Sequence, residues 1–464
     1  MNAPSRQPLW WEGASSSPRP ALGSDLDVDV CIVGGGFSGL WTARELLRRD
    51  PSLRVAVVEA RTCGFGASGR NGGWASALFP APAEHVLDLV GAAGERHLTA
   101  TLRAAVGDLG AALAHDGVDA HFRHGGTITF ATTDAQRHRL RLEVEAAHQR
   151  GDKDSDIAWL SASELAERHG QVAGQEGGIF DAHCAAIHPF LAVTGLADAV
   201  ERSGAQIFEN SPVTRITPAR GHRRAAAVTV AGTVRADIVV RATEGFSTQF
   251  TSARRDLVPL YSLMVATEPQ SEEFWAAHGL AQGETFADGR HLIIYGQRTL
   301  DNRLAFGGRG APYHFGSAVE PRFDHSPTVT NLLGESLRQL FPTLSGELTH
   351  SWGGPLAMPR NHLPFVTLDH ERGLAALGGY TGDGVVMRYL AGRSLAALIA
   401  GDADDVLDVQ RLAFVQRPPQ KWEVEPVRWL GINMGLWLAT RADAREQATG
   451  SPAPYDRWLE RLLG

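Results

Sequence analysis

Residues 28–39 read V-D-V-C-I-V-G-G-G-F-S-G, and residues 55–59 read V-A-V-V-E. The first apolar run predicts a buried strand, and residues 40–49 after the glycines have a helical pattern. The second apolar run predicts another strand, which ends at Glu59. Gly34, Gly36 and Gly39 have the spacing G-x-G-x-x-G, and Glu59 follows Gly39 at about 20 residues. This order within residues 27–71 predicts a dinucleotide-binding unit.

Each residue of the motif has its own role in such a unit. Gly34 permits the tight turn out of the strand, Gly36 lets a pyrophosphate approach the backbone, and Gly39 lets the helix pack close to the strand. The helix N-terminus offers free N–H groups to the phosphates. Glu59 can accept hydrogen bonds from the hydroxyls of an adenosine ribose and would repel a 2′-phosphate, so NADP is disfavoured. The alternative is a glycine-rich turn without a ligand, and the motif alone does not separate FAD from NAD.

Composition indicates an ordinary globular enzyme. The chain has 464 residues, 43% hydrophobic and 21% charged, with a net charge of −8, so no general attraction to nucleic acid is expected. Its three cysteines, Cys31, Cys63 and Cys184, give no disulfide framework and indicate a reducing, cytoplasmic location. Residues 1–24 lack the apolar segment of a signal peptide. No apolar run is long enough for a transmembrane helix, so stable membrane insertion is not expected.

The next stretch carries a resemblance. Residues 63–74 read C-G-F-G-A-S-G-R-N-G-G-W. Directly after the ribose acid, this sequence resembles the D-amino-acid-oxidase-like FAD-dependent oxidoreductases. It is most similar to their gamma-glutamylputrescine oxidase-like branch, which is related to glycine and sarcosine oxidases. The resemblance covers nearly the whole chain and implies FAD as the cofactor, held without a covalent bond.

The fold class expected is α/β: a Rossmann-like FAD-binding domain interrupted by a substrate domain with a mixed or antiparallel sheet and helices. The FAD-binding domain is expected at residues 25–80, 171–255 and 350–400, and the substrate domain at residues 81–170 and 256–349. Residues 1–24 are expected to form a surface arm, and residues 401–464 a helical tail. In that tail an apolar helix is predicted at residues 427–438, and packing on the body of the protein is favoured over contact with a membrane.

The pattern also predicts the individual elements. Strands are expected around 118–131 and at 205–208, 211–216, 225–230, 233–240, 261–267, 291–297, 303–308 and 374–378. Helices are expected at 83–114, 134–150, 164–168, 190–203, 328–340 and 384–399. Ser161 and Glu164 have the spacing of a capping box.

The motif and the resemblance together imply a set of cofactor-binding residues. They are Gly34, Gly36, Phe37, Ser38, Gly39, Glu59, Ala60, Arg61, Gly66, Ala67, Ser68, Arg70, Asn71, Gly72, Gly73, Trp74, Val213, Ala242, Thr243, Gly245, Gly354, Gly379, Thr381, Gly382, Asp383, Gly384 and Val385. The sequence departs from the family pattern at Glu244, which stands between Thr243 and Gly245 of a family A-T-G run. Arg70 is expected either to contact flavin or substrate, or to brace the loop.

The reaction that the resemblance implies is oxidation of a C–N bond. A hydride passes from carbon to flavin N5, and the imine then hydrolyses to a carbonyl. No protein acid or base is required, so no catalytic residue is assigned. Substrate-pocket candidates are Trp74, Tyr261, Tyr295, Arg309, Trp352 and Tyr380, although an aromatic residue is more often simply part of the core.

The substrate is expected to be a primary or secondary amine. Amino-acid-oxidising relatives carry an arginine just past a W-x-G motif to pair with the substrate carboxylate, and here Pro355 and Leu356 follow. An amine without an α-carboxylate is therefore favoured, unless Arg309 or Arg360 replaces that arginine. Oxygen and another electron acceptor both stay open.

Other interpretations are retained. The main alternative is an amino-acid oxidase or dehydrogenase. A flavin monooxygenase would need an NAD(P)H site, for which no second G-x-G-x-x-G is found, and a flavin-binding protein without turnover is the remaining possibility. His183, Cys184 and His188 cluster in sequence, but no fourth ligand is found, so no metal is expected.

Overall fold

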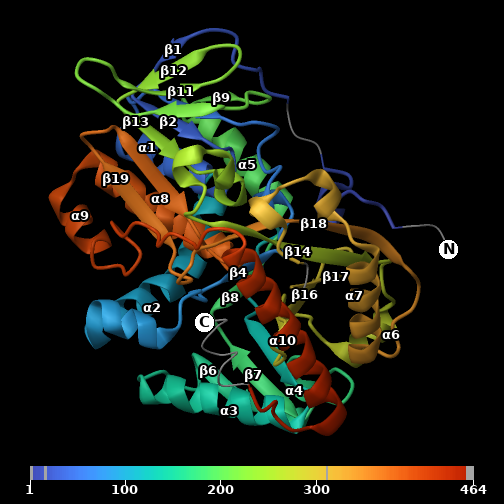
Figure 1. Cartoon of the computed structure of the whole chain (residues 1–464). Coiled ribbons are helices and arrows are strands. Elements are labelled where there is room, and N and C mark those ends of the chain that lie inside the picture. Colours follow the sequence, from blue (N-terminus) through green and yellow to red (C-terminus); the bar gives the residue numbers. More distant parts are fainter. Residues whose placement is uncertain (1–3, 15–17, 310–311, 456–464) are drawn as a thin grey trace.

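The computed structural model describes residues 4–14, 18–309 and 312–455, without the side chain of Arg309. Its first sheet has six strands in the order β19-β20-β13-β2-β3-β9 (Figure 1). All neighbours in it are parallel except the edge pair β19 and β20. The strands are β2 Val30–Val33, β3 Val55–Val58, β9 Gln206–Phe208, β13 Ile238–Arg241, β19 Phe365–Asp369 and β20 Leu374–Gly378.

Two layers cover this sheet. Helices α1 Phe37–Arg49, α5 Pro189–Arg202 and α8 Gly384–Ala400 form one core with Val30 and Ile32. Cys31 and Val33 point to the other face, where they pack on a four-stranded sheet. That sheet contains β1 Leu26–Asp27, β10 Arg215–Thr217, β11 Ala225–Val228 and β12 Thr233–Ala236. Burial on both faces explains why residues 30–33 are apolar without alternation.

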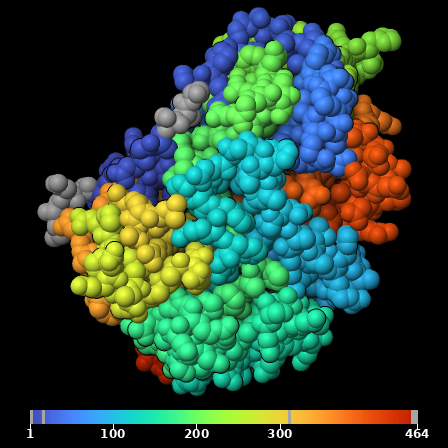
Figure 2. All heavy atoms as spheres, turned by 180° about the vertical axis from the view of Figure 1, so that it is seen from behind, coloured from blue at the N-terminus to red at the C-terminus, as the bar shows by residue number. Residues whose placement is uncertain are grey.

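The second large sheet has eight strands in the order β18-β14-β17-β16-β15-β5-β7-β6. It is mixed, because β5 and β15 are parallel while the other pairs are antiparallel. The strands are β5 Thr127–Ala131, β6 Ile157–Leu160, β7 Gly177–Asp181, β14 Val258–Thr267, β15 Thr285–Asp288, β16 Ile294–Arg298, β17 Leu304–Arg309 and β18 Leu348–Met358. Its helices are α3 Asp134–Gln149, α4 Ala162–Arg168, α6 Glu272–His278 and α7 Pro327–Leu340. The expected α/β fold class, with a Rossmann-like part and a mixed-sheet part, is confirmed, and Figure 2 shows the two parts from behind.

Two segments lie elsewhere than their expected domains. Helix α2 Ala83–His115 packs its apolar stripe of Leu98, Leu102 and Val106 into the core of the Rossmann-like part. Strand β18 pairs with β14 along nearly its whole length, so residues 350–358 belong by hydrogen bonding to the eight-stranded sheet. Both segments therefore connect the two parts.

Several expected strands are shorter or divided. Residues 233–240 form two strands in different sheets, because the chain changes sheets at Asp237, whose N–H donates to the Asp29 carbonyl. Residues 211–214 and 118–126 are not strands, and residues 291–293 precede β16 as loop. The expected capping box is present at Ser161 and Glu164.

The two ends of the chain are more closely integrated than expected. Trp10, in the turn Leu9–Trp11 (η1), is 2% exposed, and its Nε1 donates to the Asn71 carbonyl at 2.8 Å. Helix α9 is Ala403–Val409, and α10 spans Val427–Thr449, longer than predicted, with one face packed on the body. In the described ranges, no helix combines the length and the apolar character needed to cross a bilayer.

Candidate active site

A cavity of about 670 Å³ lies at the carboxyl ends of β2, β3 and β13. This is the edge of an open parallel sheet where ligands bind in such folds. Many of the lining residues are predicted cofactor residues: Gly34, Gly36, Ser38, Glu59, Ala60, Arg61, Gly66, Ala67, Ser68, Val213, Ala242, Thr243 and Gly245. Its volume falls in the range of about 300–1,000 Å³ that is usual for small-molecule sites.

The first turn requires glycine at two positions, because a side chain there would collide with backbone atoms. Gly34 has φ +116°, and a Cβ there would lie 2.6 Å from the Ala242 carbonyl oxygen. A Cβ on Gly39 would lie 2.1 Å from the Gly34 carbonyl oxygen, so this glycine sets how closely α1 packs on the turn. The N-cap residue of α1 is Gly36, which has no side chain to cap the helix. Ser68 Oγ, from the following loop, accepts the Phe37 N–H at 2.9 Å. The remaining free N–H groups can hold phosphate oxygens.

Glu59 lines this cavity directly after strand β3. Its carboxylate accepts the N–H groups of Gly35 at 2.7 Å and Arg61 at 2.8 Å, which fix its orientation. Burial raises the pKa of this carboxyl, while the two N–H groups lower it. A carboxylate has about four acceptor positions, so two are left for the hydroxyls of a ribose.

Glu244 and Arg388 form a pair that sequence analysis did not connect. Glu244 has φ +44°, and its carboxylate accepts the Gly379 N–H at 2.9 Å and lies 3.4 Å from the Arg388 guanidinium. Burial raises the pKa of Glu244, and Arg388 opposes the rise. Glu244, the extra residue between Thr243 and Gly245, therefore links the loop after β13 to the turn before α8 by a hydrogen bond. Both side chains also line the dinucleotide cavity.

A second cavity, of about 350 Å³, adjoins the first. Ala67 lines both, and neighbouring residues of β18 divide them: Pro355 lines the first cavity, whereas Gly354 and Leu356 line the second. The second cavity is bounded by Arg70, Asn71, Gly72 and Trp74 on the loop and by Gly382 and Asp383 before α8. The two cavities therefore meet where the far ring of a dinucleotide would lie. We call the second one the substrate cavity.

The predicted cofactor residues that line neither of these two cavities have identifiable contacts. Phe37 and Val385 are buried in the core, and Gly39 packs on Gly34. Gly73 has φ +71° beside Gln297, Gly379 donates to Glu244, Gly384 begins α8, and Thr381 lines a third cavity of about 360 Å³.

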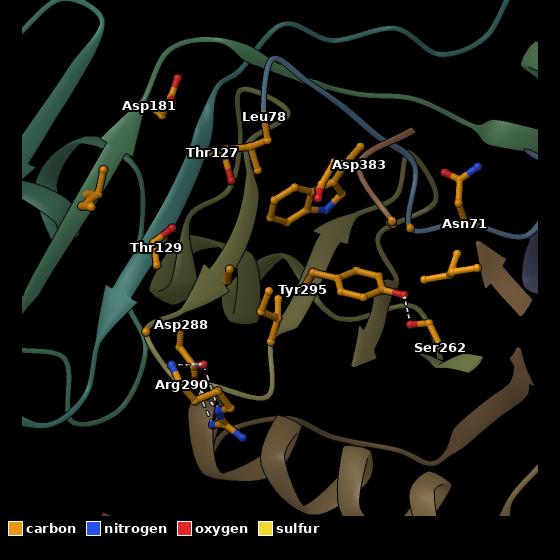
Figure 3. Close-up of a pocket in the computed structure, with 18 of the residues that line it drawn as sticks. Asn71, Leu78, Thr127, Thr129, Asp181, Ser262, Asp288, Arg290, Tyr295 and Asp383 are labelled. Carbon is orange, nitrogen blue, oxygen red and sulfur yellow. Dashed lines mark hydrogen bonds and ion pairs between the residues drawn. The ribbon is translucent and has the colours of Figure 1, made fainter. Parts of the chain in front are cut away.

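The substrate cavity is bounded on its far side by α3, β5 and β7. Figure 3 shows Asn71 and Asp383 on one side, Asp181, Thr127 and Thr129 on the opposite side, and the Tyr295 ring reaching toward Ser262. The cavity is thus assembled from segments that are distant in sequence.

Tyr295 and Trp74 form an aromatic wall in this cavity. Their ring centroids lie 6.2 Å apart at 79°, and the Tyr295 hydroxyl lies 2.8 Å from Ser262 Oγ. Gly72 and Gly307 make room for the tyrosine, because a Cβ on either would lie 2.6 Å from its ring. Trp74 Nε1 is buried and has no hydrogen-bond partner among the described residues. A ligand could accept a hydrogen bond from this N–H only if the indole ring shifted to expose it.

The charged groups of the cavity fall into two kinds. Arg290 is paired with Asp288 at 2.6 Å, and Arg139 with Glu446 at 3.0 Å. Glu143 also lines the cavity, together with Asp181 shown in Figure 3, and neither is in an ion pair within the described part of the chain.

These two carboxylates have raised pKa values. Desolvation by the surrounding protein raises the pKa of Glu143, and nearby Asp181 adds to the rise. Burial also raises the pKa of Asp181, against the lowering effect of the hydrogen bond from the His183 N–H. The end of the cavity away from Asn71 is therefore acidic.

Three of the other substrate candidates, all with described side chains, do not line this cavity. Trp352 is buried and donates from Nε1 to the Arg70 carbonyl at 2.9 Å, and Tyr380 is buried with its hydroxyl 3.2 Å from Ser38 Oγ. Tyr261 lines the third cavity instead. The Arg309 side chain lies outside the described residues.

Two further arginines have structural partners. Arg70 braces its loop: its Nε donates to the Phe65 carbonyl at 2.6 Å, and its guanidinium pairs with Asp324 at 2.7 Å. Arg360 pairs with Glu423 at 2.9 Å beside the third cavity, so it does not take the place of a carboxylate-binding arginine in the substrate cavity.

The expected histidine and cysteine cluster separates in three dimensions. Cys184 Sγ lies 3.4 Å from Thr285 Oγ1, His188 caps α5, and His183 Nε2 lies 3.2 Å from Asp156. A different group of metal-ligand type, His291, Asp443 and Glu446, is present in the described ranges. Its carboxylates already hold Arg139 and the His291 and Leu292 N–H groups, which opposes cation binding.

These cavities define the class: an oxidoreductase that holds a dinucleotide cofactor on a Rossmann-like sheet. The family model for "FAD dependent oxidoreductase" (DAO) matches residues 29–398. The chain therefore belongs to the DAO family of FAD-dependent oxidoreductases, and FAD is its cofactor.

Individual relatives agree with this assignment. Gamma-glutamylputrescine oxidoreductase of Escherichia coli (strain K12) is 30% identical over 396 residues, which cover 84% of this chain and 87% of that protein. A probable oxidoreductase of Rhizobium meliloti (strain 1021) is 28% identical, over 85% of this chain and 89% of that protein. The fold is similar to that of glycine oxidase from Geobacillus kaustophilus, with a TM-score of 0.68 at 23% identity, covering 81% of this chain and 95% of that one.

Proposed function

We propose that this enzyme oxidises a C–N bond in an amine that carries no carboxylate on the carbon beside the nitrogen. The observation that supports the proposal best is the charge pattern of the substrate cavity. The three described arginines that line it, Arg70, Arg139 and Arg290, are each paired with a carboxylate. Leu356 lies where amino-acid-oxidising relatives are expected to hold a carboxylate. A carboxylate there would lose its hydration without gaining a bidentate partner.

The chain's own residues prepare the amine. Trp74 and Tyr295 form an apolar, water-excluding wall, and desolvation favours the neutral form of an amine, which is the reactive form. The loop at Asn71 is suited to orient the substrate. The residues from Gly34 to Glu59 and the loop at residues 66–74 would hold FAD, which would supply a hydride acceptor for the carbon beside the nitrogen, and the imine product would hydrolyse in water.

FAD is proposed to be held without a covalent bond, chiefly by backbone groups and Glu59. The three cysteines are buried, and Cys63, in the flavin loop, has a pKa raised well above its usual value by burial. A buried thiol of this kind is a poor nucleophile for attachment. The relative from Escherichia coli, named for gamma-glutamylputrescine, supports an amine as substrate.

The test is anaerobic mixing of the purified flavoprotein with simple amines, secondary amines and α-amino acids while the flavin spectrum is recorded. The proposal predicts bleaching by amines and little by α-amino acids. Bleaching by α-amino acids alone would show an amino-acid oxidase instead. Consumption of NADPH that depends on substrate and oxygen would show a monooxygenase, and an unchanged spectrum with every compound would indicate no turnover of this class.

A further inference from the structure

The inner face of helix α10 packs on the body of the protein, whereas its outer face is apolar and exposed. Arg428, Gly435, Ala439, Ala442 and Glu446 are buried against the body of the protein. The outer face carries large apolar side chains that are more than half exposed: Val427 58%, Leu430 57%, Met434 51% and Trp437 53%. Their spacing of three and four residues places them on one stripe of the helix. Figure 1 shows α10 running across the front of the molecule.

Further apolar side chains adjoin the stripe at its start. Trp429 is 37% exposed, and Val424, just before the helix, is 59% exposed. Phe315 is 60% exposed in a segment that is fastened to this end of α10, since Gly316 N–H donates to Glu425 at 3.0 Å. Contiguous apolar surface of this kind on a water-soluble protein indicates a contact with something else.

Charge distinguishes the two faces as well. The exposed charged residues of α10 are Arg441 and Arg445, both basic, and the Arg441 guanidinium lies 4.3 Å from the centroid of the Trp437 ring. The acidic residues face inward: Asp443 accepts the His291 and Leu292 N–H groups, and Glu446 pairs with Arg139. The outer face therefore combines an apolar stripe with a basic end.

We propose that the outer face of α10 docks on the surface of an anionic lipid bilayer, with the helix lying in the plane of the headgroups. Leu430, Met434 and Trp437 would enter the acyl boundary, and Arg441 and Arg445 would contact the lipid phosphates. This is the composition expected of an interfacial helix, and tryptophan and arginine suit the headgroup region. The chain as a whole has a net charge of −8, so general attraction to such a surface is absent and binding depends on this face.

A second copy of the chain is a poorer occupant of the same face. A two-fold pairing would present identical stripes to each other. The acidic residues of α10 face the body, and Glu423 just before the helix is already paired with Arg360, so among the described residues of this face neither copy offers an unpaired acidic group to Arg441 or Arg445. Lipid phosphates supply the complement that a second copy lacks.

The experiment uses the full-length flavoprotein and vesicles of phosphatidylglycerol mixed with phosphatidylcholine, or of phosphatidylcholine alone, separated by sedimentation. We expect binding to the anionic vesicles that weakens with salt. Leu430→Glu with Met434→Glu should raise the lipid concentration for half-binding by at least about a hundredfold. Arg441→Gln with Arg445→Gln should raise it roughly thirtyfold.

Controls separate docking from misfolding. Val230→Glu introduces a charge at another apolar residue, which is 92% exposed in the hairpin of β11 and β12, and it should leave vesicle binding unchanged. Retained flavin in each variant reports an intact fold. Absence of vesicle binding at low salt, or binding that the Leu430→Glu and Met434→Glu pair does not weaken, would overturn the proposal. A dimer that this pair disrupts, without vesicle binding, would overturn it in favour of a second copy.

Discussion

The dinucleotide cavity and the substrate cavity meet at Ala67, yet they are built in different ways. The first is formed largely by backbone at tight turns, and its shape depends on glycines that admit no side chain. The second is formed by side chains of α3, β5, β7, β16 and β18, which are far apart in the chain. Cofactor choice is therefore encoded locally, whereas substrate choice depends on how distant segments come together. Each variant described below tests whether FAD affinity and amine preference can be changed independently.

The largest effect is expected at the first cavity. Gly39→Ala would place a Cβ 2.1 Å from the Gly34 carbonyl oxygen and force α1 away from the turn. A cost of about 3 kcal/mol or more corresponds to a loss of FAD affinity of roughly a hundredfold or more. Flavin content after purification and FAD titration of the apoprotein measure it. Gly107→Ala, in open space on α2, is the matched control and should keep its flavin. Unaltered FAD affinity in Gly39→Ala would refute this account of the turn.

The next effect concerns the aromatic wall. Tyr295→Ala removes the ring that fits between Gly72 and Gly307 and opens the substrate cavity to water. We expect the second-order rate constant for flavin reduction by the amine to fall roughly thirtyfold, with FAD affinity unchanged. Anaerobic stopped-flow reduction measures it. In Tyr295→Phe, which keeps the ring but loses the hydroxyl and its contact with Ser262, the rate constant should fall by much less. Loss of FAD in Tyr295→Ala would mean that the two cavities do not act separately.

The carboxylates of Glu143 and Asp181 should affect the choice between amines more than the overall rate of flavin reduction. Glu143→Gln with Asp181→Asn is expected to reduce the preference for 1,4-diaminobutane over 1-aminobutane by about tenfold, because two carboxylates that line the cavity no longer face the distal ammonium. Glu145→Gln, on the exposed side of α3, is the control. The comparison of the two amines is made by flavin reduction. An unchanged preference would show that the far end of the substrate lies elsewhere.

The same carboxylates predict a pH dependence. Their pKa values are raised, so they lose their charge at a higher pH than ordinary carboxyls do. The preference for the diamine should be full above those raised values and should decline as the pH falls through them. In the Glu143→Gln and Asp181→Asn variant the preference should be low and flat. If the preference of the wild-type enzyme for the diamine rises as the pH falls, these two carboxylates are not its cause.

The smallest effect is expected at Tyr380. Tyr380→Phe removes a hydroxyl that lies 3.2 Å from Ser38 Oγ and touches neither cavity. One hydrogen bond of about 1 kcal/mol corresponds to a loss of FAD affinity of about fivefold. Amine preference should not change, and isothermal titration with FAD measures the loss. A changed amine preference would place Tyr380 in the substrate site after all.

The first cavity was largely predictable because its requirements are local. The motif from Gly34 to Glu59 predicts a turn, a helix N-terminus and an acidic residue within one supersecondary unit, and residues from all three line the first cavity. What the motif could not predict is Arg388, which reaches the cavity from α8, and the role of Glu244 in fastening two loops. Both depend on a contact between segments about 140 residues apart, for which a single sequence gives no signal.

The second cavity was predicted only in part. Trp74 follows directly from the flavin loop and Tyr295 was among the aromatic candidates, but nothing in the sequence distinguished Tyr295 from Tyr261, which faces another cavity. Glu143 was not singled out, because its place in a polar helix is that of an ordinary surface residue. Asp181 was not singled out either. Their proximity results from the packing of α3 on β7.

The most direct test of the central claim compares 1-aminobutane with norvaline, which differs by a carboxylate on the reacting carbon. Both are mixed anaerobically with the flavoprotein, and the rate of flavin bleaching is measured against concentration. We expect rapid reduction by 1-aminobutane and at least a hundredfold weaker response to norvaline, because the described arginines that line the cavity are all paired with carboxylates. Faster reduction by norvaline would contradict it and would mean that the paired arginines, Arg139 or Arg290, exchange partners to bind an amino acid.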